Sequence, residues 1–325
     1  MLPLRFIPYA DAATTPNVIV DGAAAAATRL TLSHWPGSPT PPDLRDDLSA
    51  QIAFRALAEP ERFDGLDAVS NNHYDQDGLA SAYALVDPEA AFARRDRVID
   101  VARAGDFGSF TDRDAARIAI ALANYDDPSV EGPYDAVCAA LYASLLPGFT
   151  EMLDHPDRWR SSWEDEDAHL GESIDAIDRA VVRIDERPAA DLAIVTVPDD
   201  WAARAAHRFT QVWTEAVHPM AVDNATARLR ILLVQGHRYR LELRYETWVM
   251  YVSSAVAPRP DLRPLADQLN QLDDARWTAD APGALTPQLR LDGDAESALA
   301  PEAFIATVEQ YLASAPAAWD PFAPR

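Results

Sequence analysis

The strongest constraint on the fold is a series of short apolar stretches that end in polar residues. Residues 17–21 and 30–34 have the composition of strands that end at Asp21 and His34, and residues 66–70 have that of a third strand. Segments with apolar residues at helical spacing follow the second and third strands. This alternation of strands and helices predicts an α/β fold for the first part of the chain.

The rest of the chain predicts a second domain of a different kind. A length of 325 residues corresponds to about two domains at roughly 150 residues each. We expect an α/β domain at 1–188, which includes a long helical segment, and a smaller α+β domain at 189–325. The other expected elements are helices at 44–57, 79–85, 88–104, 200–217, 261–272 and 301–313, a mostly helical stretch at 111–187, a strand at 191–197 and antiparallel strands at 228–254.

The charge balance is strongly acidic. Asp and Glu number 52 against 28 basic residues, all of them arginine, and the formal net charge is −24. Non-specific binding of nucleic acid depends on many basic groups that neutralise phosphates, so this balance excludes long DNA or RNA as a partner. We interpret the acidity as a means of solvating the surface rather than as a function in itself.

Cysteine usage and hydropathy indicate the compartment. The single cysteine, Cys138, cannot form an internal disulfide. No stretch approaches the roughly 18–20 uninterrupted apolar residues of a membrane span. The N-terminal apolar stretch is interrupted by Pro3 and Pro8 and lacks the basic region of a signal peptide. We therefore expect a cytoplasmic protein that has no contact with a membrane.

The segment His73-Tyr-Asp75-Gln-Asp77-Gly78 carries the most chemical information. Its three metal-capable side chains alternate in a turn between a strand and a helix, where they can converge on one point beyond the end of the strand. Carboxylates with one imidazole suit Mn²⁺ or Mg²⁺, and iron and zinc accept the same types of ligand. The adjacent helix N-terminus favours an anion such as a phosphate. The alternative is that Asp77 only caps the helix, but a cap explains one acid and leaves His73 and Asp75 unexplained.

The sequence Asn-His-Tyr-Asp-Gln-Asp-Gly-Leu-Ala-Ser-Ala at residues 72–82 resembles the first motif of the DHH-type phosphoesterases. This superfamily contains single-strand-specific exonucleases, oligoribonucleotide and cyclic-dinucleotide phosphodiesterases, and manganese pyrophosphatases. In it a strand delivers an Asp-x-Asp, often preceded by His, and a helix of small residues follows. The resemblance implies a parallel-sheet domain of DHH-like type in which His73, Asp75 and Asp77 ligate a pair of divalent cations, Mn²⁺ or Mg²⁺.

A weaker likeness lies upstream, where Ser33-His34-Trp35 resembles the Asp-His-His motif of the same family. His34 matches the central, metal-binding histidine. Ser33 stands where the family has aspartate, and Trp35 stands where it has a second histidine that handles phosphate. The two motifs also occur in the reverse order along the chain, so either the core is permuted or the upstream likeness is coincidental.

The remaining ligands of the family are lone aspartates that follow strands, and Asp21 and Asp106 are the nearest candidates in this sequence. We expect Gly105 to stop the helix at 88–104, which would place Asp106 in a turn between two glycines where the backbone can approach a ligand closely. For both aspartates, a simple turn or capping role is an alternative to metal ligation.

These observations predict a divalent-metal-dependent phosphoesterase-like hydrolase that acts on a small phosphodiester, nucleotide or pyrophosphate. Two cations would polarise the phosphate and generate a hydroxide, and the partner would be a small anionic ligand that contains phosphate. The expected metal ligands are His73, Asp75, Asp77, His34, Asp106 and Asp21.

Two alternatives stay open. Trp35 favours a catalytically inactive DHH-like module that binds a ligand or a protein partner, including further copies of the chain in a homo-oligomer. In the other alternative, the acids only cap a strand–turn–helix and no metal binds.

Overall fold

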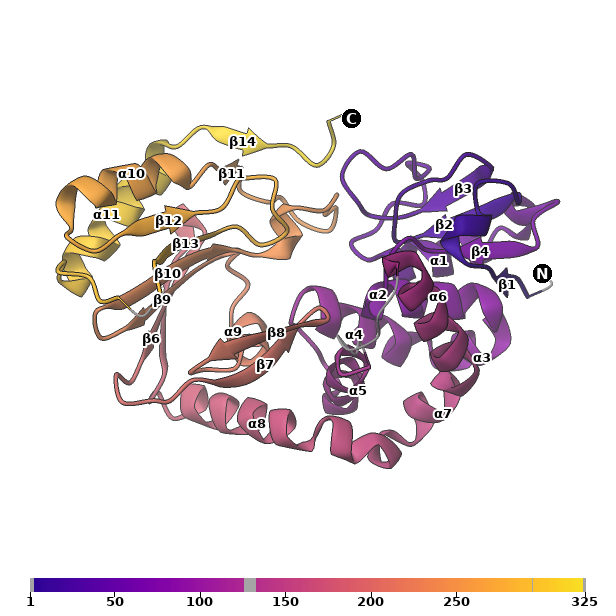
Figure 1. Ribbon diagram of the computed structural model, residues 1–325, viewed down its shortest axis with the longest axis horizontal. Helices are drawn as coiled ribbons and strands as arrows, with labels where there is room; N and C mark the ends of the chain where they lie inside the picture. Colours follow the sequence, from indigo (N-terminus) through magenta and orange to yellow (C-terminus); the bar gives the residue numbers. More distant parts are fainter. Residues whose placement is uncertain (1–2, 126–132, 294, 324–325) are drawn as a thin grey trace. The chain divides into compact units, whose positions relative to one another are not determined.

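The protein is described by a computed structural model that covers residues 3–125, 133–293 and 295–323 (Figure 1). The chain forms two compact units, each built from separate stretches of sequence. The first contains Met1–Ala168, Ala205–Thr214 and Met250–Ser253, and the second contains His169–Arg204, Glu215–Val249 and Ser254–Arg325. The expected boundary between residues 188 and 189 lies inside the second unit, in the short 3₁₀ turn between two hydrogen-bonded strands.

A four-stranded sheet in the order β1-β4-β2-β3 forms the centre of the first unit. Its strands are β1 (Arg5–Phe6), β2 (Asn17–Val20), β3 (Thr28–Leu32) and β4 (Ala68–Ser70). All neighbouring strands are parallel. Every residue of β2 is buried, as expected of a strand in a parallel sheet that is covered on both faces. The predicted α/β class with a parallel sheet is therefore confirmed.

The first two helices of this unit come after β3 and β4 in the chain, and among the described residues five more helices follow them (Figure 1). They are α1 (Ser49–Leu57), α2 (Gln76–Val86), α3 (Pro88–Ala93), α4 (Arg95–Asp106), α5 (Arg113–Ala123), α6 (Tyr134–Leu145) and α7 (Phe149–Asp154). Helix α2 is buried from Gln76 to Leu85 and packs against both α1 and α4. Its small residues allow the three helices to approach one another closely, which places the start of α2 in the interior of the unit.

Gly105 has a different role from the one predicted. The expected helix at 88–104 is interrupted at Arg94, and its second part, α4, continues through Gly105 to Asp106. Asp106 is therefore the last residue of a helix, and the predicted turn is wrong. A β-carbon at position 105 would lie 2.5 Å from the β-carbon of Gln76, so the glycine permits close packing of α4 against the start of α2.

The helix predicted at 200–217 is also wrong, because this segment forms the hairpin of β7 (Arg204–Arg208) and β8 (Gln211–Glu215). Phe209 makes the turn with a φ of 53°. The backbone N–H of His207 donates to Glu166 at 2.6 Å, and the carbonyl of Phe209 accepts from Gln76 at 3.2 Å. These long-range contacts outweigh the helical propensity of the alanines nearby, as tertiary context commonly does.

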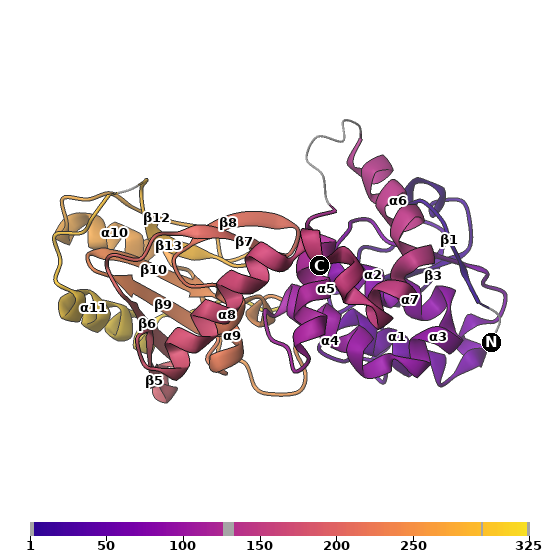
Figure 2. The same cartoon turned by 90° about the horizontal axis from the view of Figure 1, so that it is seen from below.

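The second unit contains a mixed six-stranded sheet in the order β12-β13-β10-β9-β6-β5. Its strands are β5 (Arg183–Arg187), β6 (Leu192–Val197), β9 (Arg230–Gln235), β10 (Arg238–Leu243), β12 (Trp277–Ala279) and β13 (Gln288–Leu291). Helices α10 (Arg263–Leu272) and α11 (Pro301–Ser314) lie beside this sheet (Figure 2). They share an apolar core with its strands. A second core joins the sheet to α8 (Glu164–Asp178) and α9 (Pro219–Ala225). A separate pair, β11 (Arg259–Pro260) and β14 (Ala317–Trp319), lies outside the large sheet.

One segment, Tyr134–Asp154, is long and apolar enough to cross a membrane by length and composition. It contains α6 and α7 with a 3₁₀ turn between them at Leu146–Gly148. A share of 44% of its most apolar window is buried inside the structure. A core helix passes the same test, so this one segment is weak evidence for a membrane span.

Packing at Gly105 predicts a measurable effect on stability. We expect Gly105→Ala to lower the free energy of unfolding by about 1–3 kcal/mol, because the added methyl group collides with Gln76. Gly148→Ala is the control, since a β-carbon there meets no atom within 4 Å. Urea denaturation of both variants measures the difference. Equal stability of the two variants would show that the close approach of α4 and α2 is not a packing constraint.

Candidate metal centre

The candidate site lies where three parallel strands of the first unit end. Asp21 directly follows β2, His34 lies two residues beyond β3, and the segment that contains His73 and Asp75 follows β4. Asp77 lies in the first turn of α2, and Asp106 ends α4. Because the carboxyl ends of parallel strands meet at one edge of a sheet, these side chains come together. The structure thus brings all six of the expected metal ligands into one group, while their role as ligands stays a prediction.

The Asp21 carboxylate lies between the two imidazoles. Its Oδ1 is 3.3 Å from Nε2 of His34, and its Oδ2 is 3.2 Å from Nε2 of His73. The hydroxyl of Ser49 donates to Oδ1 at 2.7 Å. Asp21 adopts a φ of 42°, in the left-handed region that aspartate tolerates better than most residues. This backbone conformation turns the carboxylate at the end of β2 toward both histidines.

The shared carboxylate joins two groups of three potential ligands. One group contains Asp21, His34 and Asp77, and the other contains Asp21, His73 and Asp75. Within each group the ligand atoms lie within 4.8 Å of one another. Donor atoms on one cation with bonds of roughly 2.0–2.6 Å lie about 3–5 Å apart, so both groups match the size of a cation site. The described part of the chain therefore contains two clusters that could each hold a metal ion, one fully buried and one with a partly exposed His73.

His34 is oriented by its other ring nitrogen. Nδ1 donates to the carbonyl oxygen of Asp47 at 2.5 Å, because a carbonyl can only accept. This bond directs Nε2 into the site, where it lies 3.5 Å from Asp106 and 3.8 Å from Asp77. A backbone carbonyl behind a ligating histidine is the usual arrangement that fixes the tautomer of a metal ligand.

The two aspartates of the Asp-x-Asp have different partners. Asp75 is the N-cap of α2, and its Oδ1 accepts the backbone N–H of Gly78 at 2.8 Å. Its Oδ2 lies 2.8 Å from Nε2 of His73. The capping role considered for Asp77 thus belongs to Asp75.

Asp77 instead joins α2 to the start of α1. Its two carboxylate oxygens accept the backbone N–H groups of Ser49 and Ala50 at 2.7 and 2.8 Å. Ser49 also contacts Asp21, and it was not among the expected site residues. In the sequence, Ser49 is marked only by its position at the start of a helix, and that position by itself does not predict a role in the site.

The loop that carries His73 is held by a buried amide. Asn71 accepts the backbone N–H of His73 at 3.1 Å and donates to the hydroxyl of Tyr142 at 3.0 Å. A β-carbon on Gly78 would lie 2.4 Å from the Asn71 amide nitrogen and 2.5 Å from the Tyr142 hydroxyl. The glycine that follows the Asp-x-Asp is therefore required by the close approach of these two side chains.

The buried charges shift one another's proton affinities. Burial opposes ionisation of Asp21, yet hydrogen bonds with both histidines hold the pKa of Asp21 well below its usual value. Burial also opposes protonation of the imidazoles, but Asp21 and Asp77 raise the pKa of His34 to about 8. The charge of Asp75, together with Asp21, raises the pKa of His73 to about 10. Burial and the charge of Asp21 raise the pKa of Asp77 to about 7.

The donor set fits a hard divalent cation. Asp21, Asp75 and Asp77 are buried and pair with imidazoles, and within the described ranges no arginine forms an ion pair with any of them. Buried carboxylates are costly unless a positive charge compensates them. Carboxylate oxygens with one imidazole per cluster are ligands that Mn²⁺ and Mg²⁺ accept. Protons on the histidines balance part of this charge in the metal-free protein, and cations would replace them.

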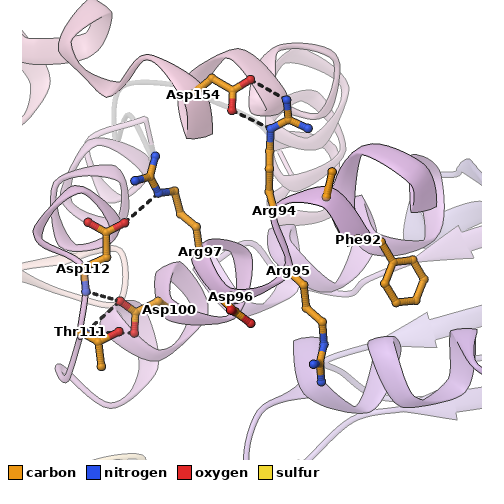
Figure 3. Close-up of a pocket in the computed structure, with 10 residues that line it drawn as sticks. Phe92, Arg94, Arg95, Asp96, Arg97, Asp100, Thr111, Asp112 and Asp154 are labelled. Carbon is orange, nitrogen blue, oxygen red and sulfur yellow. Dashed lines mark hydrogen bonds and ion pairs between the residues drawn. The ribbon is translucent and has the colours of Figure 1, made fainter.

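A pocket of about 610 Å³ lies elsewhere in the first unit (Figure 3). Its charged groups are largely paired with one another: Arg94 binds Asp154 through two hydrogen bonds, and Arg97 binds Asp112 at 2.8 Å. The pocket is lined by Phe92, Ala93, Arg94, Arg95, Asp96, Arg97, Asp100, Thr111, Asp112 and Asp154. Since arginines and aspartates alternate around it, the pocket presents no concentrated charge of one sign and we assign it no ligand.

The pKa shifts predict how the stability of the metal-free protein depends on pH. His34 and His73 bind protons more tightly in the folded chain than at the usual pKa of 6.5. Their contribution to stability is complete below that value and is lost as the pH rises through about 8 and about 10. We expect the free energy of unfolding to fall over this range, by about 2 kcal/mol for His34 alone. Urea denaturation in EDTA at a series of pH values measures it.

His34→Gln is the matched variant, because it removes the titrating group and keeps a side chain that can donate to the carbonyl of Asp47. The fall in stability between about pH 6.5 and 8 should be smaller in this variant than in the wild type. A stability that rises over this range in the metal-free wild type would contradict the assignment of protonated, buried imidazoles.

Comparison with known proteins assigns the chain to a family but not to an activity. No curated protein and no solved structure matches the chain. The sequence pattern that defines a family of unknown function (DUF6687) matches residues 2–323, which is nearly the whole length. The chain therefore belongs to the family of unknown function DUF6687.

Proposed function

We propose that the protein is a divalent-metal-dependent phosphoesterase-like hydrolase of DHH-like type that acts on a small phosphodiester, nucleotide or pyrophosphate. The observation that carries the proposal is the position of Asp21, whose two carboxylate oxygens each belong to one of two clusters of potential ligands. Hydrolytic centres with two cations hold them about 3.5–4 Å apart. A carboxylate that offers one oxygen to each cation suits such a spacing.

The residues of the site form two groups, one for each of the two proposed cations. His34 and Asp77, with Asp106 beside His34, would hold one cation, while His73 and Asp75 would hold the other. When bound, two such cations supply Lewis-acid charge to a phosphate oxygen and lower the pKa of a water molecule. Ser49 keeps Asp21 in place through its hydroxyl and Asp77 through its backbone N–H, so the chain fixes the ligands before any cation binds.

Exposure indicates the side from which a substrate would approach. The side chains of His73 and Asp75 are 16% and 12% exposed, whereas those of Asp21, His34, Asp77 and Asp106 are at most 1% exposed. A phosphate would therefore meet the cation held by His73 and Asp75 first. Trp35 lies on this side, with its ring centroid 4.9 Å from that of His73.

The charge of the chain favours a small substrate. With a net charge of −24, the protein repels a polyanion along any extended surface. A single phosphodiester, nucleotide or pyrophosphate needs only the local positive charge of the two cations. This is the reason for proposing a small phosphate-containing ligand rather than a nucleic-acid polymer.

Two observations support a DHH-like fold type: the parallel sheet and the motif that follows β4. The sheet is parallel throughout, and the His-x-Asp-x-Asp sequence leads from its strand β4 into the buried helix α2, as the resemblance implies. His34, which comes from the earlier strand β3, lies in the same group of side chains despite the reversed order of the motifs. A permuted core accounts for both observations.

Trp35 favours a second candidate function, a metal-binding module without catalysis. It stands where the DHH-type phosphoesterases have a histidine that handles phosphate, and its ring packs against His73. In that case the chain would bind cations and a phosphate-containing ligand or protein partner but would hydrolyse no phosphoester. Metal binding without turnover would favour this second function over the first.

Removal of the shared carboxylate charge tests the proposal. We expect the wild-type protein to bind two Mn²⁺ per chain and to hydrolyse bis(p-nitrophenyl) phosphate. Asp21→Asn should weaken both cation sites and lower kcat/KM by at least about 100-fold, because it removes a negatively charged ligand from both sites at once. Metal analysis after gel filtration and a colorimetric assay measure the two effects.

Asp43→Asn is the control, since Asp43 is an exposed partner of Arg62 and lies outside the site. This variant should keep both cations and full activity. The proposal would be wrong if the wild type bound no Mn²⁺, or if Asp21→Asn kept the metal content and activity of the wild type.

A further inference from the structure

A short segment from late in the chain contacts the candidate metal centre. Met250–Ser253, which we call the strap, belongs to the first unit, although the residues directly before and after it belong to the second. The backbone N–H of Met250 donates to the carbonyl oxygen of His34 at 2.8 Å. The strap thus binds the backbone of a candidate metal ligand that precedes it by more than half of the chain.

The strap also holds the residue that orients the imidazole of His34. The Oδ1 atom of Asp47 accepts the backbone N–H groups of Val252 and Ser253 at 2.8 and 2.9 Å. The carbonyl oxygen of the same Asp47 accepts from Nδ1 of His34 at 2.5 Å. Asp47 therefore connects the strap to His34: its side chain binds the strap, and its backbone carbonyl binds the imidazole ring.

A third contact reaches the other side of the same cluster. The ring of Tyr251 meets the ring of Phe107 edge to face, with centroids 5.6 Å apart. Phe107 directly follows Asp106, whose carboxylate lies 3.5 Å from Nε2 of His34, and it caps the end of α4. The four residues of the strap thus contact both sides of the cluster that contains His34.

The geometry of these bonds gives Asp47 a role in metal affinity. A carboxylate that accepts two consecutive backbone N–H groups makes strong, charge-assisted bonds that fix the orientation of its residue. Asp47 precedes α1, where its carbonyl is outside the hydrogen-bond ladder of the helix and its direction depends on such local bonds. Loss of the groups that orient a ligating histidine typically costs about 10- to 100-fold in metal affinity.

We propose that Asp47 is a positioning residue that uses the strap to hold His34 in the orientation required to bind a cation. The inference rests on the proposed function, because it concerns the cation assigned there to His34, Asp77 and Asp21. It adds that the affinity for the cation at His34 depends on residues that are not ligands, through the backbone N–H groups of residues 252 and 253. The affinity for the cation at His73 and Asp75 does not depend on Asp47 or on the strap.

Titration with Mn²⁺, followed by electron paramagnetic resonance, tests the inference. We expect the wild type to bind two Mn²⁺ that give a spin-coupled signal. Asp47→Ala should bind one Mn²⁺ with unchanged affinity and the second about 10- to 100-fold more weakly, so that the signal of an isolated Mn²⁺ appears at intermediate metal concentrations. Asp47→Asn retains an acceptor oxygen and should recover most of the affinity. A role limited to stability would lower the melting temperature and leave the two affinities equal to those of the wild type.

A second pair of variants keeps the test valid if Asp47→Ala does not fold. Val252→Pro removes one N–H donor to Asp47, whereas Val252→Ala keeps the donor and changes only an exposed side chain. We expect weaker binding of the second Mn²⁺ in the proline variant and wild-type binding in the alanine variant. Unchanged affinities in both Asp47→Ala and Val252→Pro would overturn the role of the strap and leave the proposed function intact. A wild type that binds no Mn²⁺ would overturn both.

Discussion

The structure of the first unit depends on burying several carboxylates beside two imidazoles at the end of a parallel sheet. Asp21 is central, because its two oxygens lie 3.3 and 3.2 Å from the Nε2 atoms of His34 and His73. Such a group is stable only if positive charge compensates it. In the metal-free protein that charge comes from protons on the histidines, whose pKa values rise to about 8 and about 10. A pair of divalent cations would supply it more completely.

The surrounding fold serves to hold these groups at fixed distances. The N-terminus of α1 donates two backbone N–H groups to Asp77, and the close approach of α4 to α2 requires the absence of a side chain at Gly105. Asp75 caps α2 while its second oxygen contacts His73. Asp75 and Asp77 therefore hold helix ends in place as well as belonging to the candidate site.

The sequence predicted the parts of the site that depend on local pattern. Strand ends at Asp21 and His34, and the alternation of His73, Asp75 and Asp77, were sufficient to propose one cluster, because parallel strands bring such positions together. Contacts between distant segments were not predictable in this way. Ser49, the strap and the hairpin of β7 and β8 take their roles from contacts with distant residues. At the hairpin, the sequence predicted a helix instead.

Diffraction from crystals grown with Mn²⁺, recorded at the manganese absorption edge, tests the central claim most directly. A two-cation centre should give two anomalous peaks about 3.5–4 Å apart, one on each side of the Asp21 carboxylate. One peak should lie against His34 and Asp77, and the other against His73 and Asp75. A single peak, or manganese bound away from Asp21, would contradict the two-cation centre.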